Sequence, residues 1–191
     1  MSIEETVNNS VGLKLNIGCG RRLLTDYINI DSEPLPKGLG FSLKNAEPVY
    51  LCCSSDNIPF VDETVKEIIC DHVLEHQTPE EIYETLWEFS RILIPGGILE
   101  IKVPNFEYFV ANFHTFQKDY LNAIDAMYAI LCNVRNTERM SPHRSLLWYD
   151  FLGPLIERSD FEIMTVLKSD ELYIQAVRKT TRVVRVFGGK E

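Results

Sequence analysis

Two glycines and an aspartate near the N-terminus have the types and spacing of a nucleotide-binding site. The run LNIGCG (15–20) carries Gly18 and Gly20, and the run NID (29–31) ends on Asp31. Glycine lets a turn approach a ligand closely, because no Cβ stands between them. An ionised carboxylate only accepts hydrogen bonds, which suits the two hydroxyls of a ribose. A tight turn that binds nothing is the alternative interpretation of the same glycines.

A dinucleotide is the nearest rival ligand. Its binding fingerprint is GxGxxG, followed by an acidic residue about 20 positions later. Here Leu23 stands in place of the third glycine, and only ten residues separate Gly20 from Asp31. The spacing therefore disfavours a dinucleotide.

Short apolar runs that end in turn residues predict the strands that position these residues. We expect strands over 13–17, 27–30, 49–53, 67–70 and 98–103, then a hairpin of strands over 162–168 and 171–178. Thr78-Pro79-Glu80-Glu81 fits a capping box that begins a helix, and Pro95-Gly96-Gly97 ends it. Helical spacing also covers 106–134 and 145–159, although Gly153-Pro154 must start or kink the last helix.

Strands that alternate with helices and close on a hairpin predict an α/β fold. We expect a Rossmann-like, doubly wound, mostly parallel sheet with a C-terminal antiparallel hairpin and helices on both faces. In such sheets ligands bind beyond the carboxyl ends of the strands. Four of the five expected ends carry glycine or polar residues suited to a ligand; the five are 18–20, Asp31, 54–57, Asp71-His72 and Pro104-Asn105.

With these residues in view, the sequence resembles the class I S-adenosylmethionine-dependent methyltransferases, in their short type 11-like form. The matching runs are LNIGCG (15–20), NID (29–31), NIPFVDETVKEIICDHVLEH (57–76), EFSRILIPGGILEIKVPN (88–105) and, more loosely, HRSLLWYDFLGPLIERSDFE (143–162). The resemblance spans roughly residues 13 to 178. It implies S-adenosyl-L-methionine as the cofactor and methyl transfer as the activity.

The resemblance also implies roles for single positions. Gly18 and Gly20 would let the backbone approach the methionine and ribose parts of the cofactor, and Asp31 would accept hydrogen bonds from both ribose hydroxyls. The other cofactor-binding positions that it implies are Asn16, Cys19, Ser54, Ser55, Asp56, Ile58, Asp71 and His72.

The sequence departs from the family pattern at three places. Asn16 stands where many members carry an acidic residue that contacts the amino group of the cofactor. Ser54 stands where members often carry the aspartate that holds the adenine amino group, so Asp56 or a serine hydroxyl would replace it. The ten residues between Gly20 and Asp31 are fewer than a parallel crossover usually takes. The first helix should therefore be about one turn long.

Methyl transfer needs a general base only where the attacking atom must lose a proton. His143, His72 and Asp71 are the candidates, in that order, and a histidine that only shapes its loop is the alternative for His143. Glu75-His76 is interpreted as a local structural pair. No Cys/His pairs with zinc spacing occur, so we expect no metal.

Charge and composition limit the classes of partner that the sequence allows. The net charge of −9 argues against nucleic acid and anionic membranes as partners. The five cysteines show no CxxC spacing, no signal peptide is recognisable, and no apolar run approaches the ~20 residues of a membrane span, which together predict a cytoplasmic protein. We expect a small-molecule or glycan substrate and a homodimer as the candidate assembly.

The expected organisation is one methyltransferase-like domain over 13–179, with a substrate or lid insertion over 106–148. A flexible tail (1–12) precedes it and a C-terminal tail (180–191) follows. The predicted function is S-adenosylmethionine-dependent methylation of a hydroxyl or amine on a small molecule or glycan. A non-catalytic binding or scaffold protein with the same fold is the alternative.

Overall fold

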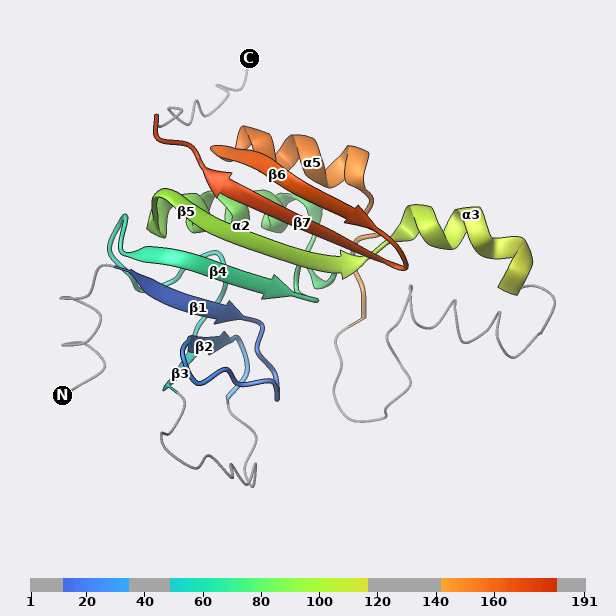
Figure 1. The fold of residues 1–191 in the computed structure, drawn as a ribbon. Helices are drawn as coiled ribbons and strands as arrows, with labels where there is room; N and C mark the ends of the chain where they lie inside the picture. Colours follow the sequence, from blue (N-terminus) through green and yellow to red (C-terminus); the bar gives the residue numbers. More distant parts are fainter. Residues whose placement is uncertain (1–11, 35–48, 117–141, 182–191) are drawn as a thin grey trace, which may run out of the picture.

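A seven-stranded sheet with the order β3-β2-β1-β4-β5-β7-β6 forms the centre of the molecule (Figure 1). The computed structural model describes residues 12–34, 49–116 and 142–181. The strands are β1 (Leu13–Ile17), β2 (Ile28–Asp31), β3 (Val49–Cys52), β4 (Val65–Asp71), β5 (Leu93–Pro104), β6 (Phe161–Lys168) and β7 (Glu171–Arg178). Strands β1 to β5 pair in parallel, and β7 pairs antiparallel with β5 and β6. The predicted mostly parallel sheet with its C-terminal hairpin is confirmed.

Strand β5 begins five residues earlier than predicted. Leu93 pairs with Val65, and the next paired position is Ile98 with Glu67. Residues 94–97, which include the expected Pro95-Gly96-Gly97 break, therefore stand against a single residue of β4 as an irregularity in the strand. The predicted helix stop at these glycines is wrong, because α2 already ends at Ile92 and the chain is back in the sheet when it reaches them.

The helices are η1 (Leu74–His76, a single 3₁₀ turn), α2 (Pro79–Ile92), α3 (Phe106–Phe116) and α5 (Tyr149–Arg158). The predicted capping box is confirmed at α2, because Thr78 Oγ1 accepts from the Glu81 N–H and Glu81 Oε2 accepts from the Thr78 N–H. Helix α5 begins four residues before Gly153, so Gly153-Pro154 does not start it and Pro154 lies inside it. The predicted helix over 106–134 is observed as far as Phe116, and its remainder lies outside the described residues.

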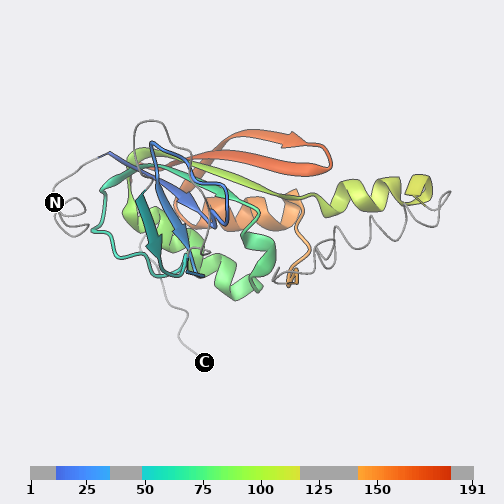
Figure 2. The ribbon, with the colours of Figure 1, turned by 90° about the horizontal axis from the view of Figure 1, so that it is seen from below.

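Helices α2 and α5 contact each other and lie on the same face of the sheet (Figure 2). The main core lies between them and a row of apolar side chains that are in register across four strands. Leu15, Ile68, Leu99 and Ala176 form one such row, and each is fully buried. Alternation of apolar and polar residues along the strands produces this face.

The opposite face of the sheet carries polar side chains at the alternate positions. Lys14 Nζ lies 2.6 Å from Glu67 Oε2, and Gln175 Nε2 donates to Glu100 Oε1 at 3.1 Å. Within the described residues, the helices that pack on the sheet cover only the first face. The predicted helices on the second face are not found in this part of the chain, whose strands carry polar side chains on that face.

The connection between β1 and β2 contains no helix. Two turns replace the expected helical turn, with hydrogen bonds from Arg22 N to Cys19 O (2.7 Å) and from Tyr27 N to Leu24 O (3.4 Å). The buried Asn29 holds the connection, because its side chain accepts from Leu24 N and donates to the carbonyls of Leu24 and Tyr27. Side-chain amides thus supply the hydrogen bonds that a helix would supply internally.

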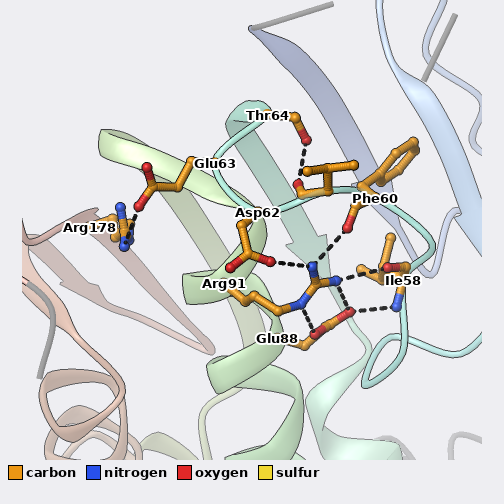
Figure 3. Close-up of polar contacts among 9 residues, drawn as sticks. Ile58, Phe60, Asp62, Glu63, Thr64, Glu88, Arg91 and Arg178 are labelled. Carbon is orange, nitrogen blue, oxygen red and sulfur yellow. Dashed lines mark hydrogen bonds and ion pairs between the residues drawn. The ribbon is translucent and has the colours of Figure 1, made fainter. Parts of the chain in front are cut away.

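Arg91 of α2 holds the segment between β3 and β4 against the helix through hydrogen bonds (Figure 3). Its guanidinium donates to the carbonyls of Ile58 and Phe60 and to the carboxylates of Asp62 and Glu88, at 2.7–3.0 Å. Glu88 also accepts from the Ile58 N–H at 2.7 Å. The planar guanidinium suits this task because its five donors are fixed in direction.

We expect Arg91→Lys to lower the free energy of unfolding by about 1–2 kcal/mol, because a lysine cannot reach both carbonyls and both carboxylates at once. Urea unfolding of the variant and the wild-type protein measures this difference. Arg158→Lys, at the end of α5, is the matched control and should leave the midpoint unchanged. Equal midpoints for Arg91→Lys and the wild-type protein would show that the hydrogen bonds in Figure 3 add nothing to stability.

Candidate cofactor site

The turn after β1 and the end of β2 meet at the carboxyl edge of the sheet. Gly18 and Gly20 have φ of 63° and 49°, in the left-handed region that glycine adopts without strain. The Cys19 N–H donates to Ile30 O at 3.1 Å, and the Gly20 N–H donates to Asp31 Oδ2 at 2.8 Å. The predicted neighbours of the ribose are therefore brought together.

The geometry of Asp31 leaves it able to bind a diol. Its Oδ1 accepts from the Glu33 N–H at 3.1 Å, so each carboxylate oxygen accepts one backbone hydrogen bond. Each oxygen of an ionised carboxylate has two lone pairs, and one on each therefore stays available to a hydroxyl. A Cβ built on Gly20 would meet nothing within 4 Å, so there is open space beside the carboxylate. This fits the ribose of a nucleoside.

The physical reason for a glycine at position 18 differs from the one expected. A Cβ at this position would lie 2.1 Å from Cγ2 of Val73, which follows β4. The prediction that a side chain at Gly18 would collide with the ligand is therefore incomplete, because it would first collide with the protein itself. Gly18 allows β1 and the chain after β4 to pack closely, whereas Gly20 borders the open space.

Two predicted cofactor-binding residues face the protein interior. Asn16 is buried and donates to Arg22 O at 2.8 Å and to Asn29 Oδ1 at 2.9 Å, so both amide hydrogens are used within the β1–β2 connection. Cys19 is also buried, and desolvation raises the pKa of its thiol to about 12. The thiol therefore stays protonated, and only the backbone of Cys19 is suited to contact a ligand.

The predicted adenine-binding segment follows β3. Ser54 Oγ donates to Asp56 Oδ1, so these two residues lie side by side. Ser55 Oγ instead accepts from Gln77 Nε2 at 2.8 Å and lies 3.2 Å from Thr85 Oγ1, which ties it to α2. The side chain of Ile58 belongs to the buried core. In this segment, Ser54 and Asp56 have the exposed polar groups that a purine amino group could reach.

Asp71 and His72 end β4 beside the glycine turn. Asp71 Oδ2 accepts from Arg22 Nη1 at 2.6 Å, and Asp71 Oδ1 lies 3.0 Å from His72 Nδ1. His72 Nε2 lies 3.4 Å from Glu171 Oε1 at the start of β7. Burial lowers the pKa of His72, although Asp71 and Glu171 act in the opposite direction. The imidazole is therefore neutral near pH 7 and can accept a proton.

His143 lies beside η1, close enough to His72 to lower the pKa of that imidazole. Its ring contacts that of His76, with 4.9 Å between the ring centroids. Glu75 is 1% exposed, and neither carboxylate oxygen has a hydrogen-bond partner in the described part of the chain. Desolvation raises the pKa of Glu75 to about 8. The interpretation of Glu75-His76 as a local pair is therefore wrong for the Glu75 side chain, which has no such partner among the described residues. Burial without a partner is costly for a carboxylate, which is why the pKa is raised.

The sequence analysis missed two residues that shape the site. Arg22 reaches from the β1–β2 connection to Asp71, and Gln77 joins Ser55 to Thr85. Arg22 and Asp71 are 49 positions apart, so no local sequence pattern predicts their contact. A basic residue directly after the glycines is a signal for Arg22, since this loop must lie over the strand ends.

Residues 15–101 match the family model of the methyltransferase domain. Among solved structures, the chain is similar to an S-adenosylmethionine-dependent methyltransferase from Methanosarcina mazei. The two are 15% identical, the match covers 95% of this chain and 99% of that one, and the TM-score is 0.59. A methyltransferase from Clostridium acetobutylicum is 12% identical over 93% and 89% of the two chains, with a TM-score of 0.63.

A third similar structure contains ligands. It is the 1,6-didemethyltoxoflavin-N1-methyltransferase of Burkholderia thailandensis, with 1,6-didemethyltoxoflavin and S-adenosylhomocysteine bound. It is 13% identical over 89% of this chain and 72% of that one, with a TM-score of 0.58. At such identities the likeness establishes the fold. No curated protein matches the sequence, and no helix in the described residues is long and apolar enough to cross a membrane.

Proposed function

Because residues 15–101 match the family model of the methyltransferase domain, we propose that the chain is an S-adenosylmethionine-dependent methyltransferase. The observation that carries the proposal is the Asp31 carboxylate at the end of β2, oriented by the Gly20 N–H and bordered by open space at Gly20. Such a carboxylate suits the ribose diol of a nucleoside cofactor. Asp31 would hold the ribose, Ser54 and Asp56 the adenine, and the backbone of 18–20 the methionine part.

When bound, the cofactor supplies an electrophilic methyl group on a cationic sulfur. The residues of this chain contribute position and proton transfer. Holding the attacking atom in line with the methyl group removes much of the barrier, because alignment is no longer left to chance encounter. Asp71 and Glu171 are ion-paired with Arg22 and Lys102, so Asp31 contributes the negative charge at this edge that suits a cation.

We assign the general base to His72, which departs from the order expected from the sequence. Both oxygens of Asp71 already contact Arg22 or His72, and His143 lies with Glu75 and His76. We assign the proton of neutral His72 to Nδ1, which faces Asp71 Oδ1, and the basic lone pair to Nε2, which lies 3.4 Å from Glu171 Oε1. After proton uptake, Asp71 and Glu171 stabilise the imidazolium. This resembles the way in which a carboxylate orients the histidine of a hydrolase triad.

The substrate that we propose is a hydroxyl or amine of a small molecule or glycan. Among the similar structures, the Burkholderia enzyme binds a small heteroaromatic molecule, and one from Thermotoga maritima is described as a possible histamine N-methyltransferase. The segment 106–148 is the proposed substrate region, and its described helix α3 extends away from the sheet (Figure 1).

Calorimetric titration with S-adenosylhomocysteine tests the proposal. We expect saturable binding of one molecule per chain. Mass spectrometry of molecules released from the purified protein should show the cofactor or its demethylated product. A protein that binds neither S-adenosylmethionine nor S-adenosylhomocysteine would be the non-catalytic relative of the fold and would overturn the proposal.

We expect Asp31→Ala to weaken S-adenosylhomocysteine binding by more than tenfold, since two hydrogen bonds to a charged acceptor are lost. The same titration measures this. The matched control is Asp26→Ala, which removes an exposed carboxylate from the same connection and should leave the affinity unchanged. Circular dichroism checks that the turn survives without the Gly20 N–H contact. An unchanged affinity in folded Asp31→Ala would refute the role of Asp31.

A further inference from the structure

Glu75, His76 and His143 converge on one point beside the proposed cofactor site. Each offers one ligand atom, and these atoms all lie within 4.8 Å of one another. Glu75 and His76 come from η1, and His143 comes from the segment that precedes α5, more than sixty positions later. No zinc-type spacing along the chain indicates such a site, because these two segments meet only in the fold.

In the described part of the chain, the buried Glu75 carboxyl group lacks the hydrogen-bond partner or counter-charge that its ionised form would need. It is 1% exposed, and both oxygens are without a hydrogen-bond partner among the described residues. The two imidazoles beside it therefore approach it without hydrogen bonding to it. A cation between the three groups would satisfy the carboxylate and use the imidazole lone pairs at once.

The surroundings of His76 favour a metal ligand. Its Nδ1 lies 3.4 Å from Pro142 O, and because a carbonyl oxygen can only accept, this contact favours the tautomer with the proton on Nδ1. The lone pair is then on Nε2. Metal-binding histidines commonly donate their other ring N–H to a carbonyl or carboxylate in this way.

The segment that carries His143 is held in place by hydrogen bonds that use none of the three candidate ligand atoms. The N–H groups of Arg144 and Ser145 both donate to Glu75 O, at 2.7 and 3.1 Å. Ser145 Oγ donates to Gln77 O at 2.6 Å, and Arg144 pairs with Glu81. The three candidate ligands are therefore preorganised before any ion binds.

We propose that Glu75, His76 and His143 bind a divalent transition metal ion, with zinc as the ion that fits best. Two imidazoles and one carboxylate are a ligand set of zinc sites, and three protein ligands leave a fourth tetrahedral position open. The ion joins η1 to the segment before α5 at the edge of the proposed site. The inference does not depend on methyl transfer, since it rests on other residues.

Titration of the EDTA-stripped and desalted protein with ZnCl₂ tests the proposal. We expect one zinc ion per chain by calorimetry and by elemental analysis after desalting. CoCl₂ should give the visible absorption bands of Co²⁺ bound with low coordination number by nitrogen and oxygen. Zinc at 100 times its Kd should raise Tm by about 5–10 °C.

The isosteric variant Glu75→Gln and the variant His143→Gln should each weaken zinc binding at least tenfold. His114→Gln, which changes the histidine of α3, is the matched control and should bind zinc as the wild-type protein does. Zinc binding below one ion per chain in the wild-type protein would overturn the proposal, as would equal affinity in Glu75→Gln. Should the variants fail to fold, the zinc-induced Tm rise of the wild-type protein decides, and its absence overturns the proposal.

The metal site and the cofactor site can be tested separately. S-adenosylhomocysteine binding to the EDTA-stripped protein tests the cofactor site without the metal. Zinc binding without S-adenosylhomocysteine binding would remove the methyltransferase proposal and keep the metal site. The reverse result would keep the methyltransferase and remove the metal.

Discussion

Replacing Gly18 with alanine is expected to lower the free energy of unfolding by about 2–5 kcal/mol. The left-handed backbone, with φ of 63°, costs an alanine about 1–2 kcal/mol. The new Cβ would also lie 2.1 Å from Val73 Cγ2, and overpacking of this kind typically costs about 1–3 kcal/mol more. Thermal unfolding should show a Tm lower by roughly 5–15 °C.

Two further variants separate these contributions. Gly20→Ala has a left-handed φ but open space around its Cβ, so we expect only the backbone cost, together with weaker S-adenosylhomocysteine binding. Adding Val73→Ala to Gly18→Ala removes the collision and should recover part of the lost stability. If Gly18→Ala proved no less stable than Gly20→Ala, the close packing of Gly18 on Val73 would be unimportant.

His72→Asn is expected to reduce methyl transfer by about 10²–10⁴-fold, the usual contribution of a positioned acid or base. Asparagine is chosen because it tolerates the positive φ of 58° at this position. Turnover is measured with the first substrate found by screening small-molecule and glycan hydroxyls and amines. S-adenosylhomocysteine affinity should change little, since Asp31 and the glycine turn are intact.

The pH dependence distinguishes a base from a residue that only shapes the pocket. Burial lowers the pKa of His72, with His143 and Lys102 acting in the same direction and Asp71 and Glu171 against it. Wild-type turnover should therefore fall on acidification with a midpoint below 6.5, and added imidazole should partly restore His72→Asn. A variant that keeps the same acid limb would show that another group is the base.

The strands were predictable because each lies on a sheet whose two faces differ. Leu15 and Ile17 alternate with polar residues, as do the residues of β7, and this period identified both strands. The capping box at Thr78 is equally local. The early start of β5 at Leu93 was not predictable, because the pairing with Val65 overrides the Pro95-Gly96-Gly97 break.

The residues of the candidate site are also of two kinds, those that the sequence predicts and those that it does not. Gly18, Gly20 and Asp31 follow from residue type and spacing, and the structure brings them together. Asn16 and Ser55 do not, because their hydrogen-bond partners belong to other segments of the chain. Burial of the Glu75 carboxylate likewise depends on where the segment before α5 lies, which no local pattern specifies.

The helix-free link between β1 and β2 has a consequence for how the protein folds. Leu15 pairs with Ile28 across a parallel ladder although the two are only 13 positions apart. Loop closure over so few residues has a small entropic cost, whereas parallel pairing usually requires a much longer loop. We expect this ladder, with Asn29 bonded to its connecting loop, to form before the pairing of β1 with β4 and to act as an early nucleus of the sheet.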